Sequence, residues 1–291
     1  MKIIINDTID LRADFGTIAL QGHLRSVITP PVLKPFDFTE WADEHGTDYD
    51  TTNPVFDIRS VAIPFYSTSE LNYRALVGFL EQSIENKWHF EAISRSYTLR
   101  LINNGNVVQR DGRWWFTLTF LEDMPTLSET TPEMVEHKTG YTIDGVDFGS
   151  FGCRFLQGHI QEVGRPFTPK KNLIISSKHT PGQHYPDRNT YFQNKQVRFP
   201  MYFRGENVLS MLDSLVWKLS RPGFREFGIE TSSDTFKFIH KSIEVVEFTA
   251  KEWLKINLNL EFENSNLINL LIDKYCDLLI DDENSTLRII L

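Results

Sequence analysis

Two kinds of hydrophobic spacing alternate along the 291-residue chain. Apolar residues recur at every second position in 114–121 and in 253–262, as in a strand with one buried and one solvated face. In 71–84 and 208–219 they recur at helical spacing instead. Further strands are expected at 58–66, 96–102, 197–203 and 236–239. The alternation predicts a mainly β protein with α-helices, of the α+β class.

Local signals predict where the two helices begin and end. Ser67 and Glu70 have the S-x-x-E spacing of a capping box, so we expect the first helix to begin after Ser67 and to run to about Asn86. The string Arg221-Pro222-Gly223 should stop the second helix, because proline cannot continue a helix and glycine tolerates a left-handed turn.

A sequence repeat runs through both halves of the chain. The string FGTIALQGHL begins at Phe15, and FGCRFLQGHI begins at Phe151, which is 136 residues later. At this offset 16 of the 52 positions 15–66 are identical, which indicates a duplication. We expect the glycine before each repeated histidine to mark a bulge or a close backbone approach. The signature residues of the repeat are Phe15, Gly16, Leu20, Gln21, Gly22 and His23 in the first copy, and Phe151, Gly152, Leu156, Gln157, Gly158 and His159 in the second.

The repeat predicts two tandem domains of one fold, at 1–126 and 141–263. The residues between them, 127–140, are polar and rich in Thr and Glu, which is typical of a linker. The remaining segment, 264–291, has no counterpart in the first copy. Its apolar residues between Leu267 and Leu279 have helical spacing, so we expect a short C-terminal helical extension.

Composition and charge narrow the function classes. The chain carries a net charge of −9 and has no run of Lys or Arg, which disfavours binding to nucleic acid through its phosphates. The first ten residues lack the pattern of a signal peptide, and no apolar stretch has the length of a membrane span, so we expect no membrane association. Cys153 and Cys276 are not part of a CxxC pair, and both are expected to be reduced and buried.

Candidate chemical sites are weakly supported. His23 and His159 have only Gln, Gly and aliphatic neighbours in both copies, which favours a structural role. The segment 37–50 holds six carboxylates but lacks the ligand spacing of a calcium loop, so we interpret it as a solvated acidic loop. His179 and His184 would need further ligands to hold zinc. No catalytic or nucleotide-binding string occurs, and we expect no metal, no cofactor and no enzymatic activity.

The order of motifs in each copy resembles a known family. An opening strand is followed by Phe-Gly, a second strand, a long polar loop, a strand ending in (I/F)-P-(F/M)-Y, and one amphipathic helix before the closing strands. This order resembles the tail-tube fold of bacteriophage tails, as used in distal tail proteins and baseplate hub proteins. YTIDGVDFGSFG from Tyr141 is similar to the start of such a domain, and VAIPFYSTSELNYRALVGFLEQSI from Val61 is similar to its strand-then-helix unit. The first copy departs at INDTID, which lacks the I-x-G turn.

The resemblance implies two tail-tube-like domains, each a β-sandwich or barrel flanked by one helix. It also implies a ring of six domains around a DNA channel. The ring would be a trimer with pseudo-sixfold symmetry or a hexamer, located in the virion tail, assembled in the host cytoplasm and bound to tube, hub and fibre proteins. The long loops 30–54 and 166–190 are the expected contacts between neighbours. Their candidate interface residues are Trp41, Asp43, Glu44, Tyr49, His179, His184 and Tyr185.

Two rival hypotheses remain. A two-module carbohydrate- or surface-binding protein would need Trp41, Trp114 or Tyr49 clustered on an open groove. An enzyme with an unfamiliar site is the third candidate. The net charge of −9 suits the first hypothesis, because a DNA channel must not bind the DNA that passes through it.

Overall fold

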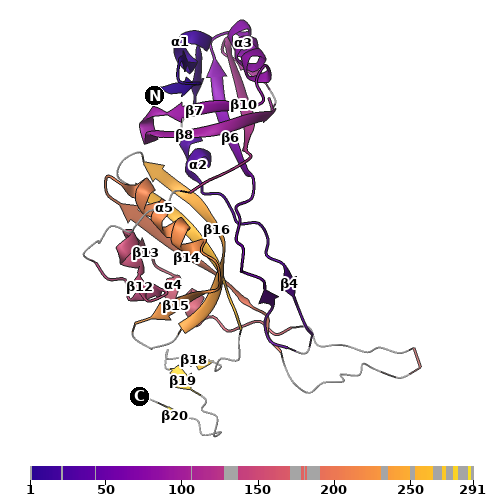
Figure 1. Cartoon of the computed structure of the whole chain (residues 1–291), viewed down its shortest axis with the longest axis vertical. Helices are drawn as coiled ribbons and strands as arrows, with labels where there is room; N and C mark the ends of the chain where they lie inside the picture. The colour runs from indigo at the N-terminus through magenta and orange to yellow at the C-terminus, as the bar shows by residue number, and fades with distance from the viewer. Residues whose placement is uncertain are drawn as a thin grey trace.

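Two large antiparallel sheets, one in each half of the chain, dominate the computed structural model (Figure 1). The structure describes residues 2–20, 22–42, 44–105, 107–127, 137–170, 178–179, 181, 191–230, 235–249, 253–264, 271–272, 278–280 and 288–289. We call 2–127 the first half and 137–264 the second half. The α+β class is confirmed, since strands predominate and short helices lie between them.

The first half forms a sheet with the strand order β2-β1-β7-β8-β10-β6-β3, and β9 pairs with β10. Its strands are β1 (Ile3–Ile5), β2 (Ile9–Asp10), β3 (Thr17–Ala19), β6 (Arg59–Ser67), β7 (Asn86–Phe90), β8 (Arg95–Asn103), β9 (Val108–Arg110) and β10 (Arg113–Glu122). Its helices are α1 (Leu11–Phe15), α2 (His23–Ile28) and α3 (Glu70–Glu81), with a 3-10 turn, η1 (Glu91–Ile93), between β7 and β8.

The second half forms a sheet with the strand order β12-β11-β15-β16-β17-β14-β13. Its strands are β11 (Tyr141–Ile143), β12 (Val146–Asp147), β13 (Cys153–Phe155), β14 (Lys195–Arg204), β15 (Arg225–Ile229), β16 (Thr235–Thr249) and β17 (Trp253–Phe262). A 3-10 turn, η2 (Phe148–Phe151), and the helices α4 (His159–Gly164) and α5 (Val208–Leu219) lie between them.

The two strand orders become identical when each strand is replaced by its counterpart. β1, β2 and β3 correspond to β11, β12 and β13, β6 to β14, β7 to β15, β8 to β16, and β10 to β17. Helices occupy matching places too, since α3 follows β6 as α5 follows β14. The element order of one half therefore recurs in the other.

Each half buries its own aromatic core. Phe65, Trp88 and Phe120 are fully buried in the first, and Phe199, Phe227 and Phe262 are fully buried in the second. Alternation produces these cores, because every second residue of β14 from Lys195 to Phe203 is buried. Burying one such ring contributes about 1.5–3 kcal/mol.

The predicted strands are confirmed, and both boundaries of the first helix need correction. β6, β8, β10, β14 and β17 lie within two residues of their predicted ranges, whereas β16 extends ten residues beyond Ile239. The N-cap of α3 is Ser69, whose Oγ accepts a hydrogen bond from Asn72 N at 3.2 Å. Ser67 is wrong as a cap, because it stays in β6 and pairs with Thr17 and Trp114. The helix ends at Glu81, since Asn86 already begins β7.

The predicted C-terminal helix is wrong at the positions that the structure describes. β18 (Leu271–Ile272), β19 (Leu278–Ile280) and β20 (Arg288–Ile289) form a small antiparallel sheet. Leu271 pairs with Leu279, which in turn pairs with Ile289. Short apolar runs satisfy a helical and a strand pattern equally well, so spacing alone could not separate the two.

The first copy forms the same turn as the second, although its sequence lacks the I-x-G motif. Asn6 and Asp7 have φ values of 50° and 62°, and Asp144 and Gly145, at the same place in the second half, have 48° and 77°. Asn and Asp tolerate the left-handed region better than other residues with a Cβ atom. INDT therefore turns as IDGV does, without the glycine.

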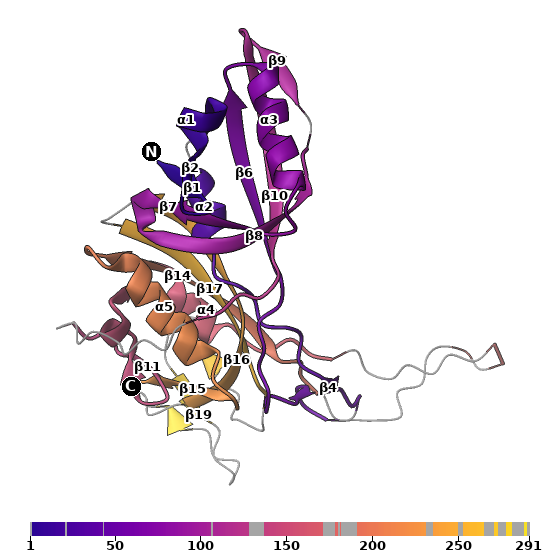
Figure 2. The ribbon, with the colours of Figure 1, turned by 45° about the horizontal axis from the view of Figure 1, so that its top comes forward.

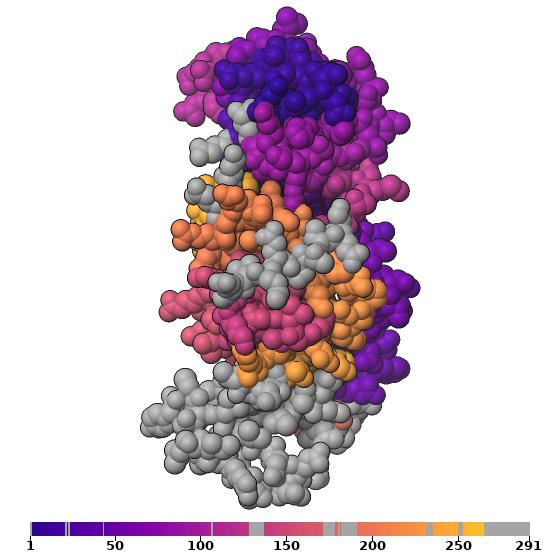
Figure 3. Space-filling model, turned by 60° about the vertical axis from the view of Figure 1, so that its left-hand side comes forward, coloured from indigo at the N-terminus to yellow at the C-terminus, as the bar shows by residue number. Residues whose placement is uncertain are grey.

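A long arm leaves the first sheet between α2 and β6. This first arm (30–57) carries the hairpin of β4 (Phe38–Thr39) and β5 (Asp48–Tyr49). We call 166–193, the chain between α4 and β14, the second arm; the structure describes 166–170, 178–179, 181 and 191–193 of it. In Figures 1 and 2 the first arm runs away from the first half and along the second half. Figure 3 shows its violet atoms against the orange surface of the second sheet.

Candidate interaction surface

The repeated Phe-Gly pair ends a short helical turn beneath the long helix of each half. Gly16 and Gly152 have φ values of 54° and 74°, which favour glycine. A Cβ atom on Gly16 would lie 2.4 Å from Asn72 Nδ2, and one on Gly152 would lie 2.4 Å from Met211 Sδ. The repeat therefore preserves a backbone conformation and a close approach to the helix at both places.

The repeated Leu-Gln-Gly-His leads into a helix, and the predicted bulge is wrong. Gly22 (φ 91°) and Gly158 (φ 106°) are the N-caps of α2 and α4, and no atom lies within 4 Å of a Cβ placed on either. Glycine is needed there for its positive φ, not for space. Leu20 N donates to Pro64 O and Leu156 N to Pro200 O, both at 2.8 Å.

The repeated histidine is structural where its side chain is described. His159 Nδ1 lies 2.7 Å from Leu156 O, and its ring contacts those of Tyr141 and Phe155 at centroid distances of 5.3 and 5.2 Å. The side chain of His23 and the residue Gln21 lie outside the described residues, whereas Gln157 is exposed before the turn.

Both halves bury a cation against the end of the short helix. Arg59 Nη1 donates to Val27 O at 2.7 Å and to Thr29 O at 2.9 Å. Lys195 Nζ donates to Val163 O at 2.6 Å and to Arg165 O at 2.9 Å. Donors at these carbonyls satisfy the end of the helix. Donor and acceptor positions both move by 136 residues between the halves.

The bases of the two arms are also built alike. Leu33 forms an isolated bridge with Phe56, and Pro169 forms one with Phe192. Lys34 N donates to Val55 O, and Lys170 N donates to Tyr191 O. These are again the same contacts at the repeat offset, so the 136-residue periodicity extends into the arms.

The tip of the first arm docks on the base of the second arm. Lys170 Nζ donates to Gly46 O at 2.6 Å and to Trp41 O at 2.8 Å, and it lies 3.5 Å from Glu40 Oε1. Gly46 N donates to Phe192 O at 2.8 Å. The rings of His45 and Phe192 stack with centroids 5.7 Å apart. The Lys170 side chain is only 6% exposed, so the arm covers it.

A polar cluster on the outer face of the second sheet holds Tyr49. Its hydroxyl donates to Glu261 Oε1 at 2.7 Å, and the same carboxylate accepts from Asn194 Nδ2 at 3.0 Å and pairs with Lys241 Nζ at 2.9 Å. Burial alone would raise the pKa of Glu261, but hydrogen bonds from these three residues outweigh it and lower that pKa. Burial and the neighbouring carboxylate raise the pKa of Tyr49. We call Asn194, Lys241 and Glu261 the polar trio.

Further contacts join the halves away from the arms. Arg25 Nε donates to Val245 O at 2.5 Å, and Ile28 at the end of α2 is buried in the second core. Arg95 pairs with Asp213 and donates to Leu209 O at 3.0 Å. The junction between the halves thus combines apolar packing with charged hydrogen bonds.

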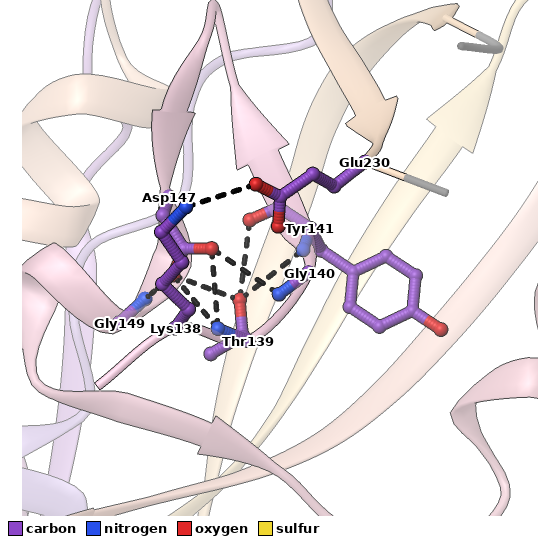
Figure 4. Close-up of polar contacts among 7 residues, drawn as sticks. All are labelled: Lys138, Thr139, Gly140, Tyr141, Asp147, Gly149 and Glu230. Atoms are coloured by element: carbon purple, nitrogen blue, oxygen red, sulfur yellow. Dashed lines mark hydrogen bonds and ion pairs between the residues drawn. The ribbon is translucent and has the colours of Figure 1, made fainter. Parts of the chain in front are cut away.

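The carboxylate of Asp147 organises the chain as it enters the second half (Figure 4). It accepts from Thr139 N and Thr139 Oγ1, both at 3.0 Å, from Gly140 N at 3.2 Å and from Gly149 N at 2.6 Å. Beside it Lys138 pairs with Glu230 at 3.0 Å. The start of the second half is therefore bound to η2 and β11.

Comparison with solved structures finds matches of low similarity. No protein-family model matches the chain, and no curated protein matches it. The chain is similar to the SPP1 Dit (gp 19.1) protein, described as a paradigm of the hub adsorption apparatus in phages that infect Gram-positive bacteria, at 11% identity. The match covers 90% of this chain and 98% of that protein, with a TM-score of 0.30. That score is too low to establish a shared fold.

The candidate interface residues fall into three groups. Trp41 is 55% exposed on the first arm, and Glu44 and His179 are exposed. Tyr49 is half-buried and bound to the polar trio, so it contacts the chain's own second half. Asp43, His184 and Tyr185 lie outside the described residues. Sequence reasoning missed Lys170 and the polar trio, although the identity of Lys34 and Lys170 in the repeat was a signal for the former.

Over the described ranges, no group of three or more His, Cys, Asp or Glu side chains could hold a metal ion. Cys153 is buried, its Sγ donates to Phe148 O, and burial raises the pKa of its thiol. No helix in the described part is long and apolar enough to cross a membrane.

Proposed function

We propose that the chain is a non-enzymatic structural component of a phage or prophage tail, at the distal tail or baseplate hub. In this proposal two tandem domains arose by duplication, and three copies close into a ring with pseudo-sixfold symmetry around the DNA channel. The ring connects tube, hub and fibre proteins in the virion tail.

The observation that carries the proposal is the recurrence of contacts at the 136-residue offset. Arg59 and Lys195 bind the ends of α2 and α4 through carbonyls at matching positions. The bridges at the base of the arms recur in the same way. A chain with two equivalent modules has two equivalent sets of surfaces, and closed cyclic symmetry is the usual way to satisfy such surfaces.

The element order supports the assignment to tail proteins. The resemblance implies strands around Phe-Gly, a long loop, a strand, one helix and closing strands. Each half contains this sequence of elements, with the arm between the short helix and β6 or β14. The net charge of −9 supports a channel that repels DNA.

The mass of the purified protein in solution tests the ring. We expect a species of three times the 33.9 kDa chain mass in sedimentation velocity, and a closed ring in electron micrographs. A chain that stays monomeric at tens of micromolar, with no ring visible, would contradict the proposal. A ring whose channel is lined by positive charge would contradict the proposed repulsion of DNA, but it would not contradict the ring itself.

The surface-binding alternative needs a shared aromatic groove. Trp41 lies on the first arm, Tyr49 is bound to Glu261, and Trp114 lies on β10 opposite Ser67. These three rings make no contact with one another in the described structure, so no observation favours that alternative.

A further inference from the structure

The docking place of the first arm has an uncovered counterpart in the first half. On the second sheet Lys170 and the polar trio receive the tip of the first arm. The repeat offset carries Lys170 to Lys34 and Asn194 to Ile58.

Strand register identifies the two remaining counterparts. Leu101 pairs with Phe120 and Asn103 with Thr119, so Ile102 is the extra residue of a bulge. His240 pairs with Leu260 and Ser242 with Asn259, so Lys241 is the extra residue at the same place. Leu121 follows Phe120 on β10 as Glu261 follows Leu260 on β17. Ile102 therefore matches Lys241, and Leu121 matches Glu261.

The counterpart of the polar trio is an exposed apolar patch. Ile58 is 53% exposed and Ile102 is 46% exposed, and Leu121 lies between them on the outer face of the sheet with its side chain half-buried. We call Ile58, Ile102 and Leu121 the apolar trio. Exposed aliphatic side chains that lie together are typical of interaction surfaces.

Lys34 differs from Lys170 only in what covers it. Its backbone makes the same contact, to Val55 O at 2.8 Å, but its side chain is exposed. No described residue forms a hydrogen bond or an ion pair with its ammonium group. The site around Lys34 therefore has the same backbone contact as the site around Lys170, but its lysine side chain is exposed.

The sequence of the second arm fits this empty place. Of the first-arm residues that make the docking contacts, Gly46 and Tyr49 are retained in the repeat as Gly182 and Tyr185, whereas Glu40, Trp41 and His45 are not. Arms are otherwise the least similar part of the repeat, since no other residue between 35 and 52 is identical at the offset. Both partners of the contact, the lysine and the glycine, are thus present twice in each chain.

We propose that the second arm of another copy of this chain docks on Lys34 and the apolar trio. The contact repeats between copies the one that the first arm makes within the chain. Lys34 donates to the carbonyl of Gly182 of the other copy, and the ring of Tyr185 packs on the apolar trio, where Tyr49 meets a carboxylate instead. This inference rests on the ring proposed above, because a ring of equivalent halves alternates contacts within and between chains.

Sedimentation velocity of surface variants tests the contact. Lys34→Ala and Ile102→Asp should each weaken self-association roughly tenfold or more, with the melting temperature of the monomer unchanged, because both side chains are exposed in the single chain. Ile84→Asp is the matched control, since Ile84 is 82% exposed and lies outside the site. Lys170→Ala should instead lower the melting temperature, because Lys170 is covered within the chain.

A photoreactive phenylalanine analogue at position 102 identifies the occupant. We expect a covalent dimer whose cross-linked peptide contains 177–185 of the second copy. A cross-link to the same chain, to another segment or to a different tail protein would overturn the inference. If the wild-type chain stays monomeric, the ring and this contact both fall. If it forms rings and the Lys34 and Ile102 variants assemble equally well, only the contact falls.

Discussion

Arg59 in the first half and Lys195 in the second bind the same two carbonyl positions with different chemistry. Arg59 pairs with Glu122 at 2.7 Å, and its guanidinium lies 4.6 Å from the centre of the Tyr97 ring. Lys195 makes no ion pair within the described residues and lies over the rings of Phe167, Phe236 and Phe262. Its burial, reinforced by the nearby Arg165, lowers the pKa of Lys195 to about 8.

The difference shows which part of the interaction the fold requires. Both residues satisfy the carbonyls at the end of a six-residue helix, α2 or α4. Among the described residues, the first half adds a largely buried carboxylate at this site, with the Glu122 side chain 14% exposed. The hydrogen bonds from a cation to the carbonyls at the helix end are therefore common to both halves. The groups that surround the charge of that cation differ between the halves.

Replacing the buried cations should give the largest difference between the halves. Arg59→Met should destabilise the protein by about 3–5 kcal/mol, because Glu122 is left buried without a partner. Lys195→Met should cost only about 1–2 kcal/mol, since it leaves carbonyls and no charge. Urea unfolding measures both.

A double replacement provides the control for this prediction. Arg59→Met combined with Glu122→Leu should recover much of the loss, because a buried ion pair and an apolar pair of similar size are often equally stable. Equal losses for Arg59→Met and Lys195→Met would show that Glu122 has no influence on the first site.

Low pH should destabilise the second half through His240, because the counterpart of this residue in the first half is Leu101, which does not titrate. Burial lowers the pKa of His240 to about 4, from 6.5. Between these values the unfolded chain binds a proton that the folded chain does not, so stability falls as pH falls from 6.5 to 4. The loss should be roughly 2–3 kcal/mol at 1.36 kcal/mol per pH unit.

His240→Leu should remove this loss, as measured by urea unfolding at pH 7 and pH 4.5. His89→Leu, at a half-buried position on β7, is the control and should keep the acid sensitivity of the wild type. An unchanged acid response in His240→Leu would assign the loss to other groups.

The smallest expected difference concerns the aspartates before the first helical turn of each half. Asp147 accepts from four donors, whereas Asp10 accepts from Arg12 N and Ala13 N. Asp10→Ala should cost about 1 kcal/mol and Asp147→Ala about 2 kcal/mol, toward the upper end for a lost cap. Melting temperatures compare the two, and a larger loss for Asp10→Ala would contradict the assignment.

Much of the fold was predictable because it depends on short-range spacing. Period-two and helical patterns located β6, β10, β14, β17 and α5, and the offset of 136 residues indicated the recurring order of elements. Sequence patterns failed where two structures satisfy them equally. Both Ser67 and Ser69 could have been the N-cap of α3, and the short apolar runs of β18 and β19 fit a helix as well as a strand.

The sequence by itself determined the repeat, the strand faces and the glycines that need positive φ, because each is written in neighbouring residues or in one constant offset. Only the tertiary structure decided that the first arm lies on the second half, where Lys170 binds Gly46 and Tyr49 binds Glu261, 124 and 212 residues away. Hydrogen bonds over such separations depend on how whole sheets are placed. The same placement leaves Lys34 and the apolar trio exposed, which no local pattern records.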